Sequence, residues 1–272
     1  MSTSASVQPS PGRLIDPRAQ RTGGWRWHVR AMRTGRSWAD ACTAIAEWLE
    51  TMPTVSSRRL VWVGASAGWM IPERWLLRFR QIDVVDLDPL CAPLLALRRG
   101  RALARASIRW QVHRFDALER MDELLSTWPD ALVLFDNVLG QQRYRYQDGE
   151  ALESWLDRLD QRMIGRAWGS IHDYLSGPIG AHRPPGPLHP LAFRMIVEGG
   201  RRAPAAQTGG SDEQRSGDAL AAWLLQAVGA RGVWQDHLTA GLFPAGTRGH
   251  LIPWRFSVTH QHWLQAAWVD AR

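Results

Sequence analysis

Short apolar runs and stretches of helical periodicity alternate along the middle of the chain. The apolar runs predict five strands, at residues 59–64, 82–86, 108–115, 131–135 and 167–175. Between them, apolar residues recur at helical spacing and predict four helices, at residues 72–80, 89–99, 118–128 and 149–163. Repeated strand–helix units predict a parallel sheet covered by helices on both faces.

The segments on either side of this repeat follow other patterns. Residues 1–24 are polar and contain proline, which predicts a disordered segment, whereas apolar residues at helical spacing predict a helical cap within residues 25–55. Residues 177–217 are rich in Pro, Gly and Arg. A segment of this length and composition predicts a lid or an insert that lies outside the sheet.

The end of the chain predicts antiparallel pairing. A helix is expected at residues 218–228, and two β-like segments at 232–243 and 255–269 are expected to pair as a hairpin. The predicted fold class is therefore α/β: a doubly wound, mostly parallel, seven-stranded sheet with a C-terminal antiparallel hairpin. We expect it to form one main domain over residues 56–272.

Composition narrows the choice of partners. The chain has 272 residues and a net charge of +7, and all 33 of its basic residues are Arg. Complete replacement of Lys by Arg points to genome composition, so a nucleic-acid partner stays possible but is not favoured. No apolar run reaches the roughly 18 residues of a membrane span, and no signal pattern is present. We expect no membrane partner and a cytoplasmic location.

The turn after the first strand is the most informative stretch. It reads Gly-Ala-Ser-Ala-Gly over residues 64–68 and follows an apolar run of strand length. The second strand ends at Asp86, 22 residues after Gly64. Glycines let a ligand approach the backbone, and an acid in this place can bind a ribose diol. The sequence therefore predicts a site for a nucleotide-like cofactor.

More polar residues follow the later strands. Asp136 and Asn137 come directly after the wholly apolar strand at 131–135, where they can face a ligand or cap the turn. Asp116 follows the third strand and can also cap a helix. His172 lies at the end of the fifth strand, where it can accept a proton from an attacking hydroxyl or amine or serve structurally.

This arrangement resembles the class I S-adenosylmethionine (SAM) dependent methyltransferases over about residues 58–270. The residues that the resemblance assigns to the cofactor are Gly64, Ala65, Ser66, Gly68, Asp86, Asp116 and Asp136. Asp86 matches the acid that binds both ribose hydroxyls, and Asp116 matches the residue that meets the adenine amino group. Asp136 and Asn137 lie in the motif that faces the methyl group and the substrate.

Two positions depart from the family pattern. Ser66 replaces the middle glycine, which ordinary backbone angles would allow. Trp62 stands near where the family carries an acid that helps to hold the amino end of the cofactor. The resemblance implies SAM-dependent methyl transfer, with a small molecule as the favoured acceptor and with Asp136, Asn137 and His172 as candidate catalytic residues.

Other functions stay open. A macromolecule (RNA or protein) methyltransferase and a non-catalytic binding module would share the fold. A nicotinamide-dependent oxidoreductase fits less well, because its fingerprint starting at Gly64 would need glycine in place of Ser66 and Trp69. No metal site is predicted: His260 and His262 lack a third ligand at a suitable spacing and are interpreted as structural.

Overall fold

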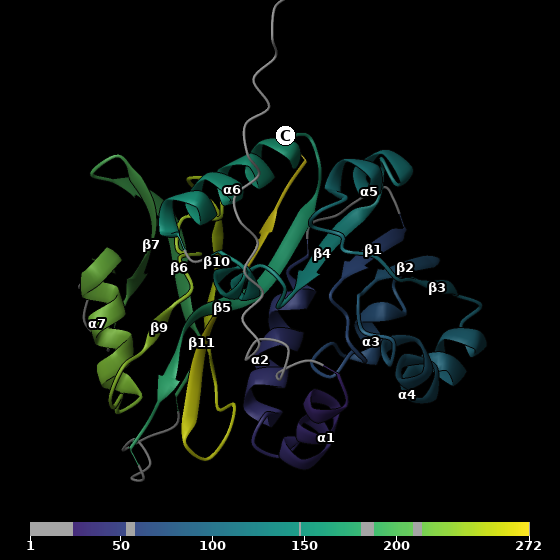
Figure 1. Ribbon diagram of the computed structural model, residues 1–272, viewed down its shortest axis with the longest axis horizontal. Coiled ribbons are helices and arrows are strands. Elements are labelled where there is room, and N and C mark those ends of the chain that lie inside the picture. The colour runs from purple at the N-terminus through teal and green to yellow at the C-terminus, as the bar shows by residue number, and fades with distance from the viewer. Residues whose placement is uncertain (1–23, 53–57, 147, 181–187, 209–213, 272) are drawn as a thin grey trace, which may run out of the picture.

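The computed structural model describes residues 24–52, 58–146, 148–180, 188–208 and 214–271. The predicted disorder of residues 1–24 falls outside this part of the chain, apart from Gly24. The described residues form an α/β structure built around one large sheet (Figure 1).

Five parallel strands form one half of the sheet, as predicted. They are β1 (Arg59–Val63), β2 (Gln81–Val85), β3 (Arg109–His113), β4 (Leu132–Asp136) and β5 (Trp168–Pro178). Their order across the sheet is β3-β2-β1-β4-β5, so the chain order reverses between β1 and β4. Open α/β sheets bind ligands at such a reversal, just beyond the carboxyl ends of the strands.

Antiparallel strands form the other half, and they make the sheet longer than predicted. Beside β5 lie β11 (His260–Val269), β10 (Arg248–Trp254), β6 (Leu191–Glu198), β7 (Arg201–Gln207) and β8 (Gln214–Ser216). A short strand, β9 (Gln235–Asp236), also pairs with β5. Within the described residues the sheet thus has eleven strands rather than the predicted seven. The terminal antiparallel pair is confirmed as β10 and β11, but its first strand is not the predicted segment 232–243.

The described part of residues 177–217 belongs to the sheet, which contradicts the prediction that it lies outside. β6 pairs with β10, and β7 and β8 continue the antiparallel order. Phe193 and Met195 are buried while their neighbours Ala192 and Arg194 are exposed, which is the two-residue period of a strand. Glycines at the turn between β6 and β7 have positive φ angles, so this glycine-rich composition reflects a tight turn between strands.

Helices cover both faces of the sheet, as predicted (Figure 1). One core cluster includes residues of α1 (Trp25–Thr34), α2 (Ala39–Glu50), α3 (Glu73–Leu76) and α4 (Cys91–Arg105). The other includes residues of α5 (Met121–Thr127), α6 (Gly149–Arg162) and α7 (Gly217–Ala227). Within the described ranges, no helix is both long and apolar enough to span a membrane.

The helix after the glycine turn is shorter than predicted. Residues 72–80 were expected to be helical, but α3 is a single turn of four residues. The chain leaves the helix because Arg80 donates its backbone N–H to the carbonyl of Arg58 and so starts the pairing of β2 with β1. A helix this short does not supply the N-terminal anion site of a long helix.

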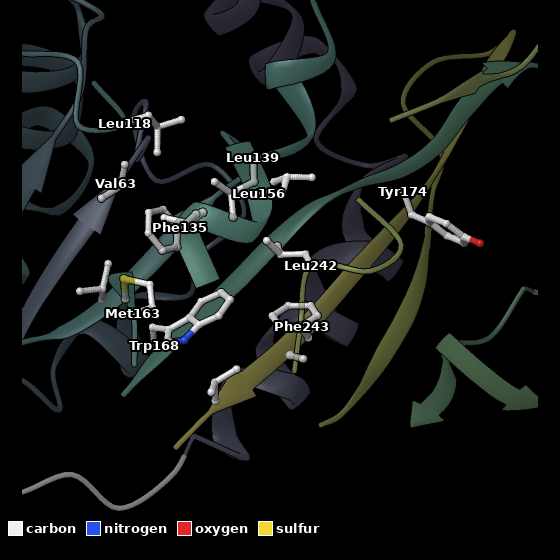
Figure 2. Close-up of a cluster of buried hydrophobic side chains, with 14 of the residues drawn as sticks. Val63, Leu118, Phe135, Leu139, Leu156, Met163, Trp168, Tyr174, Leu242 and Phe243 are labelled. Carbon is white, nitrogen blue, oxygen red and sulfur yellow. The ribbon is translucent and has the colours of Figure 1, made fainter. Parts of the chain in front are cut away.

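A cluster of aromatic and aliphatic side chains fixes the central strands (Figure 2). Phe135 on β4 meets Trp168 on β5 edge to face, with ring centroids 6.0 Å apart. Trp168 stacks in turn on Phe243 at 5.4 Å. Such buried contacts hold β4 and β5 in place. The polar residues that follow Phe135 are therefore presented by a rigid strand.

Candidate functional site

One cavity of about 1100 Å³ lies beyond the carboxyl ends of β1, β2 and β4. It extends to the parts of β5 and β11 that project past the neighbouring strands. Its lining from the parallel half of the sheet includes Gly64, Ala65, Ser66, Asp86, Asp136 and Asn137. Most of the residues predicted for the site are therefore gathered in one cavity, at the reversal of strand order.

The turn between β1 and α3 packs so closely that only glycine fits at its two ends. A Cβ on Gly64 would lie 2.0 Å from Val138 Cγ1 and 2.8 Å from the carbonyl oxygen of Asp136. A Cβ on Gly68 would lie 2.8 Å from the indole of Trp62. Both glycines have positive φ angles, 78° and 61°. Gly64 thus joins the turn to the loop after β4, whereas Gly68 faces Trp62 and does not line the cavity.

Ser66 does not have the ordinary backbone angles that would make it a simple replacement for glycine. Its φ is 53°, in the left-handed region, which costs a non-glycine residue about 1–2 kcal/mol. Its backbone N–H donates to Asp86 Oδ2 at 2.6 Å. Its hydroxyl accepts a hydrogen bond from Trp27 Nε1 at 2.8 Å. These two contacts hold the strained residue in the cavity wall.

Asp86 lies at the cavity with part of its hydrogen-bonding capacity unused. Oδ2 accepts the N–H of Ser66, and Oδ1 accepts the N–H of Asp88 at 2.8 Å. Burial raises the pKa of Asp86, although these two backbone donors work in the opposite direction. A carboxylate offers about four acceptor positions. Asp86 can therefore accept further hydrogen bonds from a ligand.

Asp88 has a different place. Its Oδ1 accepts the N–H of Leu90 at 2.9 Å, beside the start of α4, as a capping residue would. Its Oδ2 lies 2.8 Å from His28 Nε2. Trp69 Nε1 donates to the other nitrogen of His28 at 3.0 Å. Because an indole N–H only donates, His28 Nε2 carries the proton and donates to Asp88.

These contacts dock α1 beside the glycine turn. His28 and Trp27 hold the helix to Asp88 and Ser66 respectively. The first residues of α1, Trp25 to Trp27, line the cavity. The N-terminal helical segment thus forms one wall of the site.

Asp136 is a half-buried carboxylate with few hydrogen-bond donors. Trp62 Nε1 donates to its Oδ2 at 3.1 Å, and this is its only side-chain hydrogen bond within the described part of the chain. The pKa of Asp136 is raised to about 7, mainly because burial disfavours the charged form; the bond from Trp62 lowers it and the charge of Asp86 raises it. A poorly compensated carboxylate of this kind is suited to a cationic ligand.

Asn137 lies at the cavity and also braces the neighbouring strand. Its φ is 56°, a left-handed conformation that Asn tolerates better than most residues. Its Oδ1 accepts the backbone N–H of Asp173 on β5 at 3.2 Å. Asn137 therefore combines the two roles that the sequence left open, at the edge of the cavity and in holding the turn.

Asp116 is not brought to the cavity. Its Oδ1 accepts the N–H groups of Leu118 and Glu119, at 3.0 and 3.3 Å. Its Oδ2 lies 2.6 Å from Arg145 Nη1. Asp116 thus caps the turn at residues 117–119 rather than the helix α5, which starts at Met121, and it lies outside the lining of the cavity.

His172 is also not brought to the cavity. It is fully buried, with Nδ1 2.8 Å from the Ser170 hydroxyl and Nε2 3.1 Å from Gln265 Oε1. Burial lowers the pKa of His172 to about 4. Because side chains alternate along a strand, His172 points away from the face that carries its neighbour Asp173.

The sequence missed a pair of residues in the cavity wall. Asp173 on β5 and His262 on β11 both line the cavity, with His262 Nδ1 2.7 Å from Asp173 Oδ1. His262 was interpreted as structural because no third metal ligand lay at a suitable spacing, and its partner on β5 is too distant in sequence to be foreseen. An expectation that the last strand pairs antiparallel to the end of β5 would have brought the two residues close.

Comparison with known proteins gives limited information. No family model and no curated protein matches the chain. The solved structures that it resembles include methyltransferases. One is the methyltransferase domain of bacterial CtHen1-C, at 14% identity and a TM-score of 0.33, covering 52% of this chain and 65% of that one. Another is the N-methyltransferase NodS from Bradyrhizobium japonicum WM9 in complex with S-adenosyl-L-homocysteine (SAH), at 14% identity and a TM-score of 0.29, covering 54% and 65%.

Not every similar structure is a methyltransferase. One from Rhodobacter sphaeroides is described as a zinc-dependent alcohol dehydrogenase, at 18% identity and a TM-score of 0.33, covering 56% of this chain and 55% of that one. The chain spans less than two thirds of the length of each of these three structures. TM-scores this low carry no functional argument, so the function is inferred from the residues of the cavity.

Proposed function

We propose that the protein transfers a methyl group from SAM to a small-molecule acceptor. The observation that carries this proposal is that the glycine turn, Asp86 and Asp136 line one cavity at the reversal of strand order. SAM, when bound, supplies an electrophilic methyl group on a positively charged sulfur. The reaction then needs mainly the alignment of two reactants, which can lower a barrier by roughly 7–11 kcal/mol.

The residues present fit this cofactor. The close packing of Gly64 leaves the turn without a side chain at its start, so a ligand can lie against the backbone. Asp86 has unused acceptor positions for the two hydroxyls of a ribose. Asp136 offers a half-buried carboxylate to the cationic end of the cofactor. It thereby supplies the negative charge that the family places near Trp62, whose indole instead holds Asp136.

The nicotinamide alternative is less compatible with the sheet. A dinucleotide fold repeats the parallel β-α-β unit on the far side of the reversal. Here β4 and β5 are followed across the sheet by antiparallel β11 and β10. Asp136 would also place a buried negative charge near a phosphate-bearing cofactor. A ligand that is cationic and lacks phosphate suits the cavity better.

Calorimetric titration with SAH, SAM and NADH tests the proposal. We expect SAH and SAM to bind, with micromolar affinity corresponding to about −8 kcal/mol, and NADH not to bind. Because a cation binds the ionised form of Asp136, whose pKa is raised to about 7, SAH should bind more tightly at pH 8 than at pH 6. Absence of binding heat for SAH and SAM at hundreds of micromolar protein would disprove the proposed function.

Asp136→Asn separates binding from folding. The amide can still accept the hydrogen bond from Trp62, so the fold should survive. At pH 8 the ligand-free variant should melt above the wild type, because burial of the charged carboxylate costs on the order of a few kcal/mol. Its affinity for SAH should fall at least tenfold, whereas its affinity for 5′-methylthioadenosine, which lacks the ammonium group, should stay unchanged.

A further inference from the structure

The wall opposite the glycine turn is built by strands that project beyond the rest of the sheet. β4 ends at Asp136, which pairs with Ile171, whereas β5 continues to Pro178 with β11 as its partner. This extension of β5 and β11 lines the cavity with Asp173, Ser176, His260 and His262. The cavity thus has a cofactor side at the parallel strands and a second side at this antiparallel extension.

An irregularity in the pairing sets which side chains face the cavity. His262 is opposite Ser176 and Leu264 is opposite Asp173, so Tyr174 or its neighbour is an extra residue in β5. Paired residues point to the same face, and residues two apart on a regular strand do so as well. The bulge therefore places both Asp173 and Ser176 on the face that carries His262.

Asp173 is held in a fixed position. Asn137 accepts its backbone N–H at 3.2 Å, and the Thr239 hydroxyl donates to its carbonyl oxygen at 2.9 Å. A Cβ on Gly140 would lie 2.8 Å from both the nitrogen and the oxygen of Asp173. The loop after β4, which contributes Asp136 to the cofactor side, is therefore packed directly against Asp173.

The contact with His262 favours the ionised form of Asp173. Burial raises the pKa of Asp173, but the attraction to His262 and the hydrogen bond from it lower the pKa below the usual range. The ionised carboxylate of Asp173 accepts a hydrogen bond from His262 Nδ1–H, so in the neutral ring the lone pair lies on Nε2. Nε2 has no hydrogen-bond partner among the residues that the structure describes. His262 therefore presents an available base in the wall of the cavity.

Aromatic side chains surround this base. The ring of His262 lies 5.0 Å from that of Trp254 and 4.7 Å from that of Phe256, centroid to centroid. Both aromatic residues line the cavity, as do Trp27 and Tyr144. A planar aromatic ligand gains stacking contacts on such walls. The acceptor side of the cavity thus combines flat apolar surfaces with one base.

We infer that His262 is the catalytic base of the proposed methyl transfer, with Asp173 as its positioning residue, and that the acceptor is a hydroxyl group on an aromatic ring. The inference rests on the proposed function. His262 Nε2 takes the hydroxyl proton while the oxygen lone pair forms the bond to the methyl carbon. The carbon–sulfur bond breaks with its electron pair on sulfur, and the proton leaves His262 for solvent. The products are the aryl methyl ether and neutral SAH.

The test uses a chromophoric phenol and needs no turnover. We expect 4-nitrophenol to bind the complex of the full chain with SAH and to give up its proton to His262, so that the phenolate absorption appears at a pH where free 4-nitrophenol is protonated. His262→Gln should reduce the phenolate fraction of the bound dye at least tenfold. Asp173→Asn should reduce the phenolate fraction less. 4-Nitroanisole, which has no proton to lose, should bind the wild type and His262→Gln alike.

His260→Gln is the matched control, because His260 lines the cavity two residues earlier on β11 but lies near Thr259 rather than a carboxylate. It should retain the phenolate signal. An equal phenolate fraction in the wild type and His262→Gln, or no binding of 4-nitrophenol to a protein that binds SAH, would overturn the inference and leave the proposed function standing. Failure of SAH itself to bind would instead overturn the proposed function.

Discussion

The histidines on the two faces of the paired strands β5 and β11 differ in how many of their ring nitrogens are hydrogen-bonded within the protein. On one face, His172 has both ring nitrogens within hydrogen-bonding distance of buried partners, Ser170 and Gln265. On the other, His262 binds Asp173 through one nitrogen and has the second nitrogen at a cavity wall. A histidine with both nitrogens occupied can only support the fold. A histidine with one nitrogen available can exchange a proton with a ligand.

The difference arises because packed side chains cover the face of His172, whereas the face of His262 lines the cavity. His172 packs beside Phe243, with ring centroids 5.5 Å apart, in the apolar layer beneath α6. Burial there holds its pKa at about 4 and keeps the ring neutral. The face of Asp173 opens instead on the cavity beyond β4. One strand thus carries a sealed polar network and an open one at adjacent residues, because side chains alternate.

The largest expected effect comes from pushing the loop after β4 away from the open face. Gly140→Ala would place a Cβ 2.8 Å from the backbone of Asp173. Because the atoms that this Cβ would meet belong to the backbone of β5, they cannot move without distorting the strand. We therefore expect a loss of about 3 kcal/mol of stability, at the upper end of the range for overpacking. Urea unfolding measures the loss.

Gly35→Ala is the control, since its Cβ would meet only the carbonyl oxygen of Ala31 at 3.9 Å and its φ is −50°. This variant should be as stable as the wild type or slightly more stable. Wild-type stability in Gly140→Ala would show that the loop does not pack against Asp173 and would remove the support for the open network.

The second prediction concerns the loss of stability at low pH that the buried His172 should cause. The folded pKa of His172 is lowered from 6.5 to about 4, so the unfolded chain binds more protons between these values. Stability from this group is therefore complete above pH 6.5 and falls as the pH drops toward 4, by about 2 kcal/mol between pH 7 and pH 5. Burial lowers the pKa of His237 as well, which adds to the trend.

Urea unfolding at several pH values checks this prediction. His172→Gln should be less stable at neutral pH but should show a flatter dependence on pH. His260→Gln, which changes an exposed histidine, should keep the wild-type dependence. If the unfolding free energy of His172→Gln depends on pH as steeply as that of the wild type, His172 is not the buried group whose protonation destabilises the fold in acid.

The parallel half of the sheet was predictable from the sequence, and most of the antiparallel half was not. Each parallel strand is a short apolar run next to a helical period, so local patterns define it. β6 to β8 lie in a segment of Pro, Gly and Arg and are strands only through pairing, of β6 with β10 and β7 and of β8 with β7. Their partners are far away in sequence, and composition suggested a loop.

Some residues of the candidate site could likewise be predicted from the sequence, and others could not. Asp86 ends one predicted strand, and Asp136 and Asn137 directly follow another, so their place at the carboxyl edge could be foreseen. His172 does not line the cavity but its neighbour Asp173 does, because a strand end does not reveal which of two adjacent residues faces a ligand. The open face also depends on a bulge near Tyr174 and on a partner in β11. Neither is visible in local sequence.

The smallest expected effect concerns the wall across the cavity from His262. Ser66 has a left-handed φ of 53°, and its hydroxyl accepts a hydrogen bond from Trp27. Ser66→Gly removes a strain of about 1–2 kcal/mol but also removes a bond worth about 0.5–1.5 kcal/mol. Glycine adds roughly 0.5–1 kcal/mol of lost conformational freedom. These terms nearly cancel, so the net change in stability should stay within about 1 kcal/mol.

A double-mutant cycle with Trp27→Phe isolates the hydrogen bond from the strain, since phenylalanine keeps the ring but lacks the donor. We expect a coupling free energy of about 0.5–1.5 kcal/mol between the two positions in urea unfolding. Ser66→Gly should also make α1 more sensitive to proteolysis, because one of its contacts with the glycine turn is gone. Zero coupling would indicate that the hydrogen bond between Trp27 and Ser66 does not help to hold α1. The position of α1 beside the glycine turn would then depend on the hydrogen bond from His28 to Asp88 and on the packing of its apolar side chains.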